Sequence, residues 1–416
     1  QLGLLQIPAL FPLHIASYDG GLGRRSLDTP VVVYIKTPSN AYPGQLLELF
    51  ANDPLLPVAH TFVSEGDSRR DHVPLILPAA SIKPDWIDPL VARINLTGQS
   101  TLPLRVRVDL NGPGDSHGLR VQLPADVLVD GVSEARAREN IQVILWPYPY
   151  MAANDHIQLY WGDQRVQRWL DAKDVGKPVT LLVLRRGIME ARDYESLRVA
   201  VLVRGHTGNY AEPSVRWAMA GPVNVHVHND PLDAPVINGQ DPQTGVIDIE
   251  QLNGLPATAY VYASRTYFEV GETLHFFWQT IDAQARRQTF SQSREVLRLG
   301  QTYSFELAHE SIRDLAQGHL TAYYVLEKRT GPLHSSATFA TVHGPIDQWP
   351  APHVGAAGED GRLPAETPGF TVNLAYARDS GVKDSQILQV PDTTAQLQAV
   401  RAGRADAAVG PQLTRK

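Results

Sequence analysis

The feature that most constrains this chain is a pattern that recurs along it. A two-residue turn is followed by a strand of alternating apolar and polar residues that ends in aromatics. The two clearest copies end at Tyr160-Trp161 and at Phe277-Trp278, and a weaker copy ends at Phe50. Further strands and turns follow each copy at similar intervals. Because a repeated unit of this kind is one supersecondary module, the pattern predicts three copies of one fold in series.

The strands within each copy alternate with period two, as strands with one buried face do. The odd positions of 197–203 are all apolar, and 31–35 and 104–108 alternate in the same way. Helical patterning is confined to short pieces such as 134–140 and 310–316. Short alternating strands with turn signals every 8–12 residues or so are typical of sandwiches. We therefore predict an all-β chain of tandem immunoglobulin-like β-sandwiches.

Equivalent positions of the copies lie roughly 105 to 125 residues apart, which is the size of one such sandwich. The predicted domains are 1–116, 117–230 and 231–346. The last strands of the second and third are expected to end at Gly221-Pro222 and Gly344-Pro345. Two prolines and several short polar residues fill the junction between them, and such linkers limit backbone freedom. Tandem modules joined in this way are expected to form rods with limited flexing.

The turn and strand from Gly271 to Trp278, with the closing Gly-Pro, resemble the Ig-like repeats of large bacterial surface and secreted proteins of the invasin and intimin type. The resemblance covers about residues 25–346. It implies the sandwich fold and a place on the bacterial surface. It implies little about activity, because sandwiches carry many functions.

The end of the chain has a different pattern. A linker rich in Pro, Gly and Ala is predicted at 347–369, and 370–416 reads as a short βαβ-like segment. Its stretch 390–407 resembles part of a periplasmic solute-binding protein of the amino-acid type. Gly410-Pro411 stands where that family usually places an acidic residue near its ligand, so no ligand site is carried over.

Composition excludes several functional classes. A net charge of −7, with basic residues grouped only in pairs, argues against nucleic-acid binding, which needs a basic patch. The absence of cysteine excludes disulfides, thiolate nucleophiles and iron–sulfur clusters. No apolar run reaches the roughly 18 residues that predict a membrane span. The first 13 residues lack a basic leader and a cleavage site, so we expect a mature or internal start.

Metal candidates lie at the junction of the second and third copies. His226 and His228 are two apart on one strand and point the same way, but no third ligand is evident, and an exposed final strand explains them as well. Asp230 and Asp233 follow in the linker. These four residues are the metal-ligand candidates. A second set, made of the two aspartates with Asn229, Asp241 and Asp248, is typical of interdomain joints that calcium stiffens. Turn chemistry explains the same residues without calcium, so no cofactor is required.

No catalytic residue is predicted, because no Gly-x-Ser-x-Gly elbow occurs and no Ser, His and Asp share a triad-like context. Trp161 and Trp278 could serve as carbohydrate-stacking platforms. Their equivalent places in the repeat favour a structural role instead. Tyr160 and Phe277 point to the opposite face, so one residue of each pair is expected in the core and the other partly exposed, covering a neighbour or binding a partner.

We therefore predict a non-enzymatic bacterial protein, extracellular or on the cell surface, whose sandwiches act as stalk or adhesion modules. Its partners would be proteins or glycans on a surface, recognised by loops at the sandwich tips. One alternative is a structural subunit of a toxin or filament assembly that docks on neighbouring subunits. Another is a carbohydrate-binding accessory protein.

Overall fold

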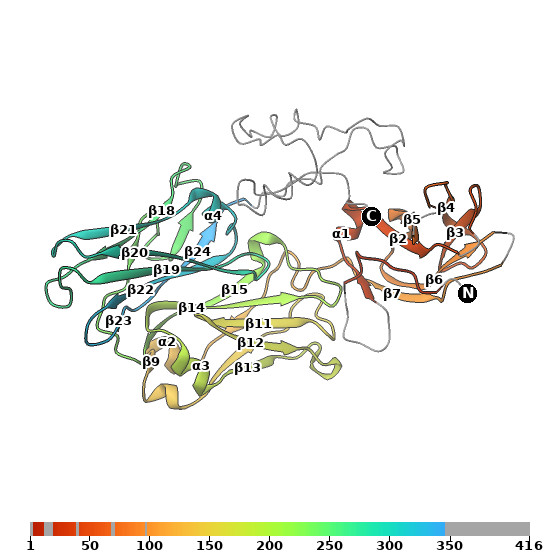
Figure 1. The fold of residues 1–416 in the computed structure, drawn as a ribbon. Helices are drawn as coiled ribbons and strands as arrows, with labels where there is room; N and C mark the ends of the chain where they lie inside the picture. Colours follow the sequence, from red (N-terminus) through yellow and green to blue (C-terminus); the bar gives the residue numbers. More distant parts are fainter. Residues whose placement is uncertain (1–2, 12–19, 39–40, 68–70, 96–97, 346–416) are drawn as a thin grey trace. The chain divides into compact units, whose positions relative to one another are not determined.

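The computed structural model describes residues 3–11, 20–38, 41–67, 71–95 and 98–345. Strands dominate these residues and the helices are short, so the prediction of an all-β sandwich fold is confirmed (Figure 1). No helix among them is both long enough and apolar enough to cross a membrane. The predicted linker 347–369 and the βαβ-like segment 370–416 lie outside the described residues.

The first sandwich pairs the sheet β2-β5 with the sheet β1-β7-β6-β3-β4. Alternation places Val33, Leu47 and Val106 in the core between the two sheets, where each is fully buried. Its elements are β1 Gly20–Leu22, α1 Arg25–Asp28, β2 Val31–Lys36, β3 Leu46–Ala51, β4 Pro57–Phe62, β5 His72–Leu77, η2 Ala79–Ser81, β6 Asp85–Ile94 and β7 Leu104–Val108.

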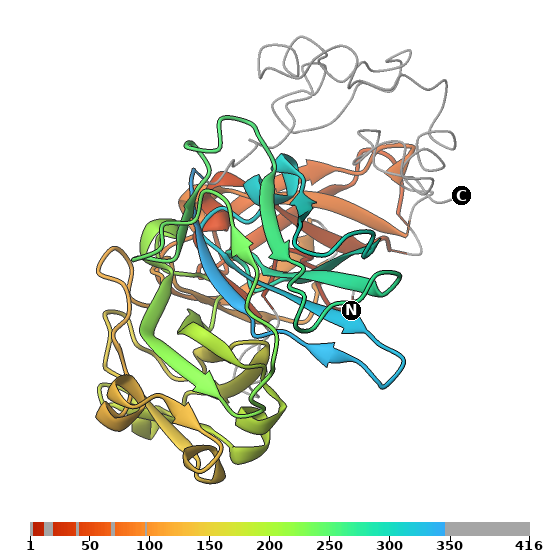
Figure 2. The same ribbon diagram turned by 90° about the vertical axis from the view of Figure 1, so that its left-hand side faces the viewer.

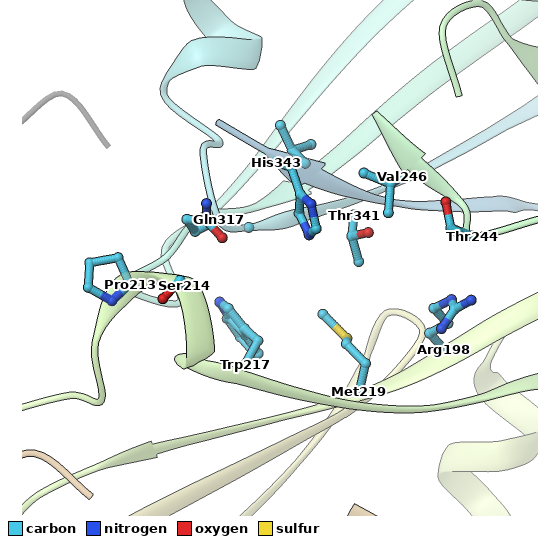
Figure 3. Close-up of a pocket in the computed structure, with 12 residues that line it drawn as sticks. Arg198, Pro213, Ser214, Trp217, Met219, Thr244, Val246, Gln317, Thr341 and His343 are labelled. Atoms are coloured by element: carbon cyan, nitrogen blue, oxygen red, sulfur yellow. The ribbon is translucent and has the colours of Figure 1, made fainter. Parts of the chain in front are cut away.

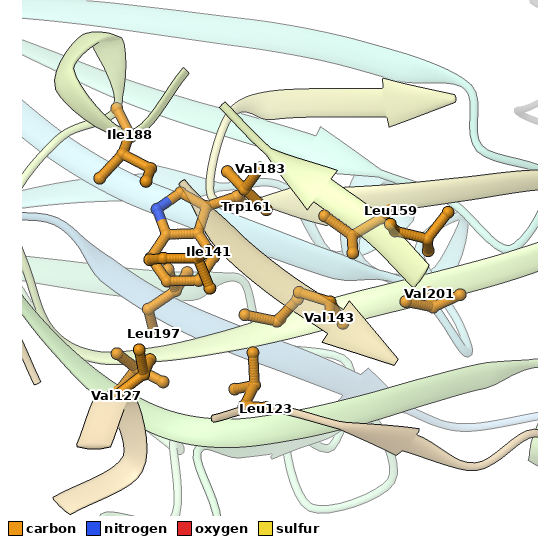
Figure 4. Close-up of a cluster of buried hydrophobic side chains, with 14 of the residues drawn as sticks. Leu123, Val127, Ile141, Val143, Leu159, Trp161, Val183, Ile188, Leu197 and Val201 are labelled. Atoms are coloured by element: carbon orange, nitrogen blue, oxygen red, sulfur yellow. The ribbon is translucent and has the colours of Figure 1, made fainter. Parts of the chain in front are cut away.

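The second sandwich pairs β13-β10-β8 with β12-β11-β14-β15-β9. The indole of Trp161 lies in its core beside Ile141 and Val183 (Figure 4). Its elements are β8 Val121–Gln122, α2 Ala125–Val129, β9 Val132–Ser133, η3 Arg136–Arg138, β10 Ile141–Leu145, β11 His156–Trp161, β12 Gln164–Trp169, η4 Ala172–Asp174, β13 Val179–Val183, α3 Arg185–Glu190, β14 Tyr194–Arg204, η5 Pro213–Val215 and β15 Trp217–His226.

The third sandwich pairs β16-β18-β21 with β17-β24-β22-β19-β20, and β23 adds to the edge of β22. Trp278 and Phe276 alternate with partly buried neighbours along β19 and fill its core. Its elements are β16 Val236–Ile237, β17 Val246–Asp248, β18 Ala257–Tyr262, β19 Thr273–Ile281, β20 Arg287–Glu295, β21 Thr302–Leu307, α4 His309–Arg313, β22 His319–Glu327, β23 Leu333–His334 and β24 Thr338–His343.

One strand order recurs in all three sandwiches. The larger sheet always begins with a short strand parallel to the last strand of the copy: β1 on β7, β9 on β15 and β17 on β24. The long central strand comes next in each sheet: β6, β14 or β22. The hairpin that contains the strand of the repeat motif follows it: β3-β4, β11-β12 or β19-β20. The larger sheet of the weak first copy therefore has the same topology as those of the two clear copies, whereas its smaller sheet, β2-β5, has two strands among the described residues and theirs have three. That these sandwiches are of the immunoglobulin type stays a prediction.

The predicted alternation in β14 is confirmed, since Leu197, Val199, Val201 and Val203 all lie in the second core. The intervening Ala200 and Leu202 are fully buried too, so the middle of this strand is covered on both faces. An unbroken apolar run is the pattern expected of a strand with two covered faces.

The predicted end of β15 at Gly221-Pro222 is wrong, because the strand continues to His226. A bulge in β14 shifts the register between Leu197 and Val199. Gly221 sits opposite it at φ +126°, where a Cβ would lie 2.7 Å from the carbonyl oxygen of Leu197. A bulge tolerates the proline that a regular ladder excludes, so the strand passes through this point.

The three cores occupy separate stretches of the chain, 5–110, 119–227 and 232–342, apart from four residues of the third sandwich that join the second core. Residues 1–347 nevertheless form one compact unit, because the sandwiches also contact one another. The division into domains 1–116, 117–230 and 231–346 stays a prediction.

Candidate functional site

Several buried polar side chains lie where the sandwiches meet, among them Asp193, His206 and Asn209. We call the contact of 20–24 and 109–115 with the loop 205–211 the first joint. We call the linker 227–235, together with the facing sheets of the second and third sandwiches, the second joint. Any mechanical or binding role of serial sandwiches depends on how these joints are held.

Asn209, which is buried, holds the first joint. Its Oδ1 accepts a hydrogen bond from the backbone N–H of Arg24 at 2.8 Å. Its Nδ2 donates to the carbonyl oxygens of Asp109, at 2.7 Å, and Asn111, at 2.9 Å. One amide of the second sandwich thus satisfies three backbone groups of the first sandwich and its linker. Because each buried backbone group needs a partner, these bonds fix the linker's path.

Close backbone approach reinforces the first joint. A Cβ at Gly112 would overlap the carbonyl oxygen of Tyr210, and one at Gly23 would overlap the Oδ1 of Asn209. Only glycine allows the two chains to come this near. The guanidinium of Arg24 ties the two segments on its own side of the joint together, with its Nη2 2.9 Å from the Oδ1 of Asp115.

A buried polar group flanks the first joint. The imidazole of His206 lies between two carboxylates, with Nε2 3.4 Å from the Oδ2 of Asp109 and Nδ1 3.6 Å from the Oδ1 of Asp155. Asp155 is itself buried and accepts a hydrogen bond from the hydroxyl of Tyr148 at 2.9 Å. Burial, followed by the charge of Asp155, raises the pKa of Tyr148 well above its usual value.

Asp193 holds the linker of the second joint. Its side chain is fully buried, and its two oxygens accept hydrogen bonds from the backbone N–H groups of Val227, His228 and Asp230 at 2.7, 3.0 and 3.2 Å. Its own carbonyl oxygen accepts a bond from the N–H of Ala337 in the third sandwich at 2.8 Å. Three N–H donors compensate the desolvation of this carboxylate.

The second joint also buries the outer faces of two sheets. Tyr160 and Ala200 of the second sandwich form one cluster with Ile281 of the third. Phe339 and Tyr323 of the third sandwich join the core cluster of the second. The blue strand β24 lies against the green β14 in this contact (Figure 2). The sandwiches therefore meet along their sheets as well as through the linker, which differs from a simple end-to-end joint.

His319 is enclosed at the centre of this contact. Its ring centroid lies 4.8 Å from that of Trp217, 5.3 Å from that of Phe339 and 5.8 Å from that of Tyr160. Neither ring nitrogen has a hydrogen-bond partner among the described residues. Burial, aided by the positive charge of Arg287, lowers the pKa of His319 from 6.5 to about 3, so the ring is neutral at pH 7.

A pocket of about 280 Å³ opens beside the same contact (Figure 3). Trp217, Met219 and Arg198 of the second sandwich form one wall. The opposite wall belongs to the third sandwich, and the polar lining residues there are Thr244, Gln317, Thr341 and His343. Among its twelve lining residues none is an aspartate or glutamate.

The four metal candidates lie at the end of β15 and in the linker that follows it. His226 and His228 are both exposed, and the Nε2 of His228 lies 2.9 Å from the carbonyl oxygen of Ala191. Burial and the nearby charge of Asp193 raise the pKa of Asp230, while Asp233 is exposed. Within the described ranges no three His, Asp or Glu side chains are grouped in a way that could hold a metal.

The remaining calcium candidates take part in turns. The Oδ1 of Asp241 accepts bonds from the N–H groups of Gln243 and Thr244, each at 2.8 Å, and these bonds lower the pKa of Asp241. The Oδ1 of Asp248 accepts from the N–H of Glu250 at 2.9 Å. Asn229 occupies a left-handed turn at φ 52°. These contacts match the turn interpretation of the same residues.

Trp161 and Trp278 are both fully buried in their cores, as equivalent repeat positions predict, and cannot stack on a ligand. Phe277 is partly buried and stacks on Tyr323, with ring centroids 5.0 Å apart. The predicted partial exposure of Tyr160 is wrong, because its side chain packs against the third sandwich at the second joint and is buried there; covering a neighbour was one of the two roles predicted for it.

Comparison with known proteins gives no family. No protein-family model matches the chain, and no curated protein matches it. Among solved structures it is similar to a Ca²⁺-stabilized adhesin with which an Antarctic bacterium binds ice, at 14% identity and a TM-score of 0.25, over 82% of this chain and 74% of that one. It is also similar to a 1.5-MDa bacterial ice-binding adhesin that was studied for its retention on the host cell surface. That match has 14% identity and a TM-score of 0.23, and it covers 82% of this chain and 98% of that one. At these values the function of this chain has to be argued from its own residues.

Sequence reasoning missed the residues that hold the joints. Asn209 follows the turn-forming pair Thr207-Gly208, and Asp193 follows Arg192 in a polar stretch, but nothing local distinguishes such a residue from one that bonds a neighbouring sandwich. A signal for the second joint was present in β14, where Val199 to Val203 is apolar at every position. Such a run indicates two covered faces, and only one of them could belong to the strand's own core.

Proposed function

We propose that this chain is a non-enzymatic surface or secreted protein whose sandwiches act as stalk and adhesion modules. The observation that supports this most is that both joints are held by buried side chains of the second sandwich, Asn209 and Asp193. Joints of this kind keep serial sandwiches in a fixed arrangement and resist bending. A fixed arrangement is useful to a protein that presents binding loops at a distance and is pulled while bound.

Adhesion under flow tests this proposal. Beads that carry the full chain are applied to a glycan array and to bacterial and animal cells, and the shear that detaches them is measured. We expect binding to at least one of these surfaces. The double variant Asn209→Ala, Asp193→Ala should detach at lower shear, because its joints lose the bonds to the linkers.

The matched control is Asp130→Ala, which removes an exposed carboxylate of the second sandwich away from both joints. It should behave as the unaltered chain does. Binding to no cell and no glycan would rule out the adhesion role. Equal detachment of the double variant and the control would rule out a role of the joints.

One observation favours the alternative of a subunit in a larger assembly. The outer face of β16 and β18 exposes Val236 at 68% and Tyr262 at 62%, and Tyr260 lies directly across from Val236. Exposed apolar side chains on one sheet face are typical of a contact surface. Sedimentation velocity separates the two functions. An assembly subunit should associate as its concentration rises, and its Tyr262→Ser variant should stay monomeric.

A further inference from the structure

The pocket at the second joint differs in charge from the rest of the chain. The whole chain carries 44 acidic and 37 basic residues. The pocket is lined by Arg198 and His343 but by no carboxylate. A concave site without carboxylates, on a protein whose net charge is negative, is suited to an anionic ligand.

Arg198 is the group that would meet the anion. The bulge in β14 places it opposite Gly221 and Pro222, and bulges commonly re-aim a side chain toward a site. It lies on the pocket wall (Figure 3) and is only partly buried. Its guanidinium makes no hydrogen bond or ion pair with any other described residue. Unlike Arg24 of the first joint, which pairs with Asp115, Arg198 therefore has a fork of donors that is available to a ligand.

The other walls suit a sugar ring rather than a bare inorganic ion. The indole of Trp217 is held in place by edge contacts with Tyr160 and His319, at 5.5 and 4.8 Å between ring centroids. Together with Met219 it offers an apolar surface that phosphate or sulfate would not use. Gln317 and Thr244 on the opposite wall offer polar groups to hydroxyls.

Volume limits the ligand to one ring. The pocket of about 280 Å³ is slightly smaller than the sites that hold drug-sized ligands, which start near roughly 300 Å³. We propose that it binds a single hexuronic acid residue, with the carboxylate paired to the fork of Arg198 and the ring packed on Trp217. This rests on the proposed function and names the class of glycan that the adhesion module would bind.

Calorimetry and saturation-transfer NMR on the full chain test the proposal, with methyl β-glucuronide as the ligand and methyl β-glucoside as its neutral match. We expect a Kd on the order of 1 mM for the glucuronide, given its few atoms, and much weaker binding of the glucoside. A glucuronide-terminated disaccharide should bind about as well, because only one ring enters the pocket.

Arg198→Gln should weaken binding of the glucuronide about tenfold or more and abolish the preference over the glucoside, since it removes a charge-assisted pair. Because Arg198 has no partner in the described chain, this variant should fold normally. The control Arg185→Gln removes an exposed arginine of α3 and should leave binding unchanged.

Three results would overturn the proposal: no binding of either glycoside, equal binding of both, or an Arg198→Gln variant that binds the glucuronide as tightly as before. None of these would affect the joints, because Asn209 and Asp193 lie outside the pocket lining. Failure here and failure of the adhesion test are therefore distinguishable, since beads can bind surfaces through other loops.

Discussion

Acid should weaken the second joint through His319. The folded chain holds its pKa at about 3, against 6.5 for an unburied histidine. A group whose pKa is lowered by folding contributes stability above its unfolded pKa, and that stability is lost as the pH falls toward the folded value. Each pH unit in this window costs about 1.4 kcal/mol, so lowering the pH from 7 to 4.5 should cost on the order of 3 kcal/mol from this residue.

His319→Phe isolates the effect. Phenylalanine keeps the aromatic contacts with Trp217 and Phe339 and carries no titratable group. At pH 7 the variant should be as stable as the unaltered chain within about 1 kcal/mol, because no hydrogen bond is lost. At pH 4.5 it should be more stable by about 3 kcal/mol.

Urea unfolding at pH 7.0 and 4.5 measures this, with hydrogen exchange of the β22 amides as a readout that belongs to the third sandwich. The control is His117→Gln, an exposed histidine, which should follow the unaltered chain at both pH values. If the unaltered chain and His319→Phe lose the same stability between the two pH values, His319 is not coupled to folding and the reasoning fails.

Three further substitutions test the packing. Trp278→Ala should destabilise the third sandwich by about 3–5 kcal/mol in urea unfolding, and a loss below about 1 kcal/mol would contradict its place in the core. Gly112→Ala should increase hydrogen exchange across the first joint, because its Cβ overlaps the carbonyl oxygen of Tyr210; unchanged exchange would show that the backbone is not close-packed there. Tyr148→Phe should cost about 1.5–3 kcal/mol, since the buried carboxylate of Asp155 loses a hydroxyl donor, and a neutral result would mean that Asp155 is otherwise satisfied.

The architecture of each sandwich could be predicted from the sequence because period-two alternation and turn residues are local signals. Val31, Val33 and Ile35 alternate and are buried as expected, and Trp161 and Trp278 occupy equivalent core positions. The residues at which strands end are harder to predict. Gly221-Pro222 looks like a turn in isolation, and only the bulge on the paired strand allows β15 to pass through it.

The joints could not be predicted, because their contacts connect residues far apart in the chain. Asn209 bonds to the carbonyl of Asp109, about a whole repeat earlier, and no local pattern specifies that partner. His319 opens a strand and would ordinarily be taken as a surface residue. Its burial depends on Trp217 and Tyr160 of another sandwich, and the pocket beside it exists only because the two sheets meet.

If the joints fix neighbouring sandwiches relative to each other, the distance between two labels on different sandwiches should have one narrow distribution, and this distance measures the rigidity of the joint most directly. The chain has no cysteine, so introduced cysteines at Thr180 and Glu306, both exposed strand positions, take spin labels cleanly. The label pair spans the second joint. We predict a single narrow distance distribution by electron spin resonance, which broadens in Asp193→Ala. A broad distribution in the otherwise unaltered chain would contradict the account.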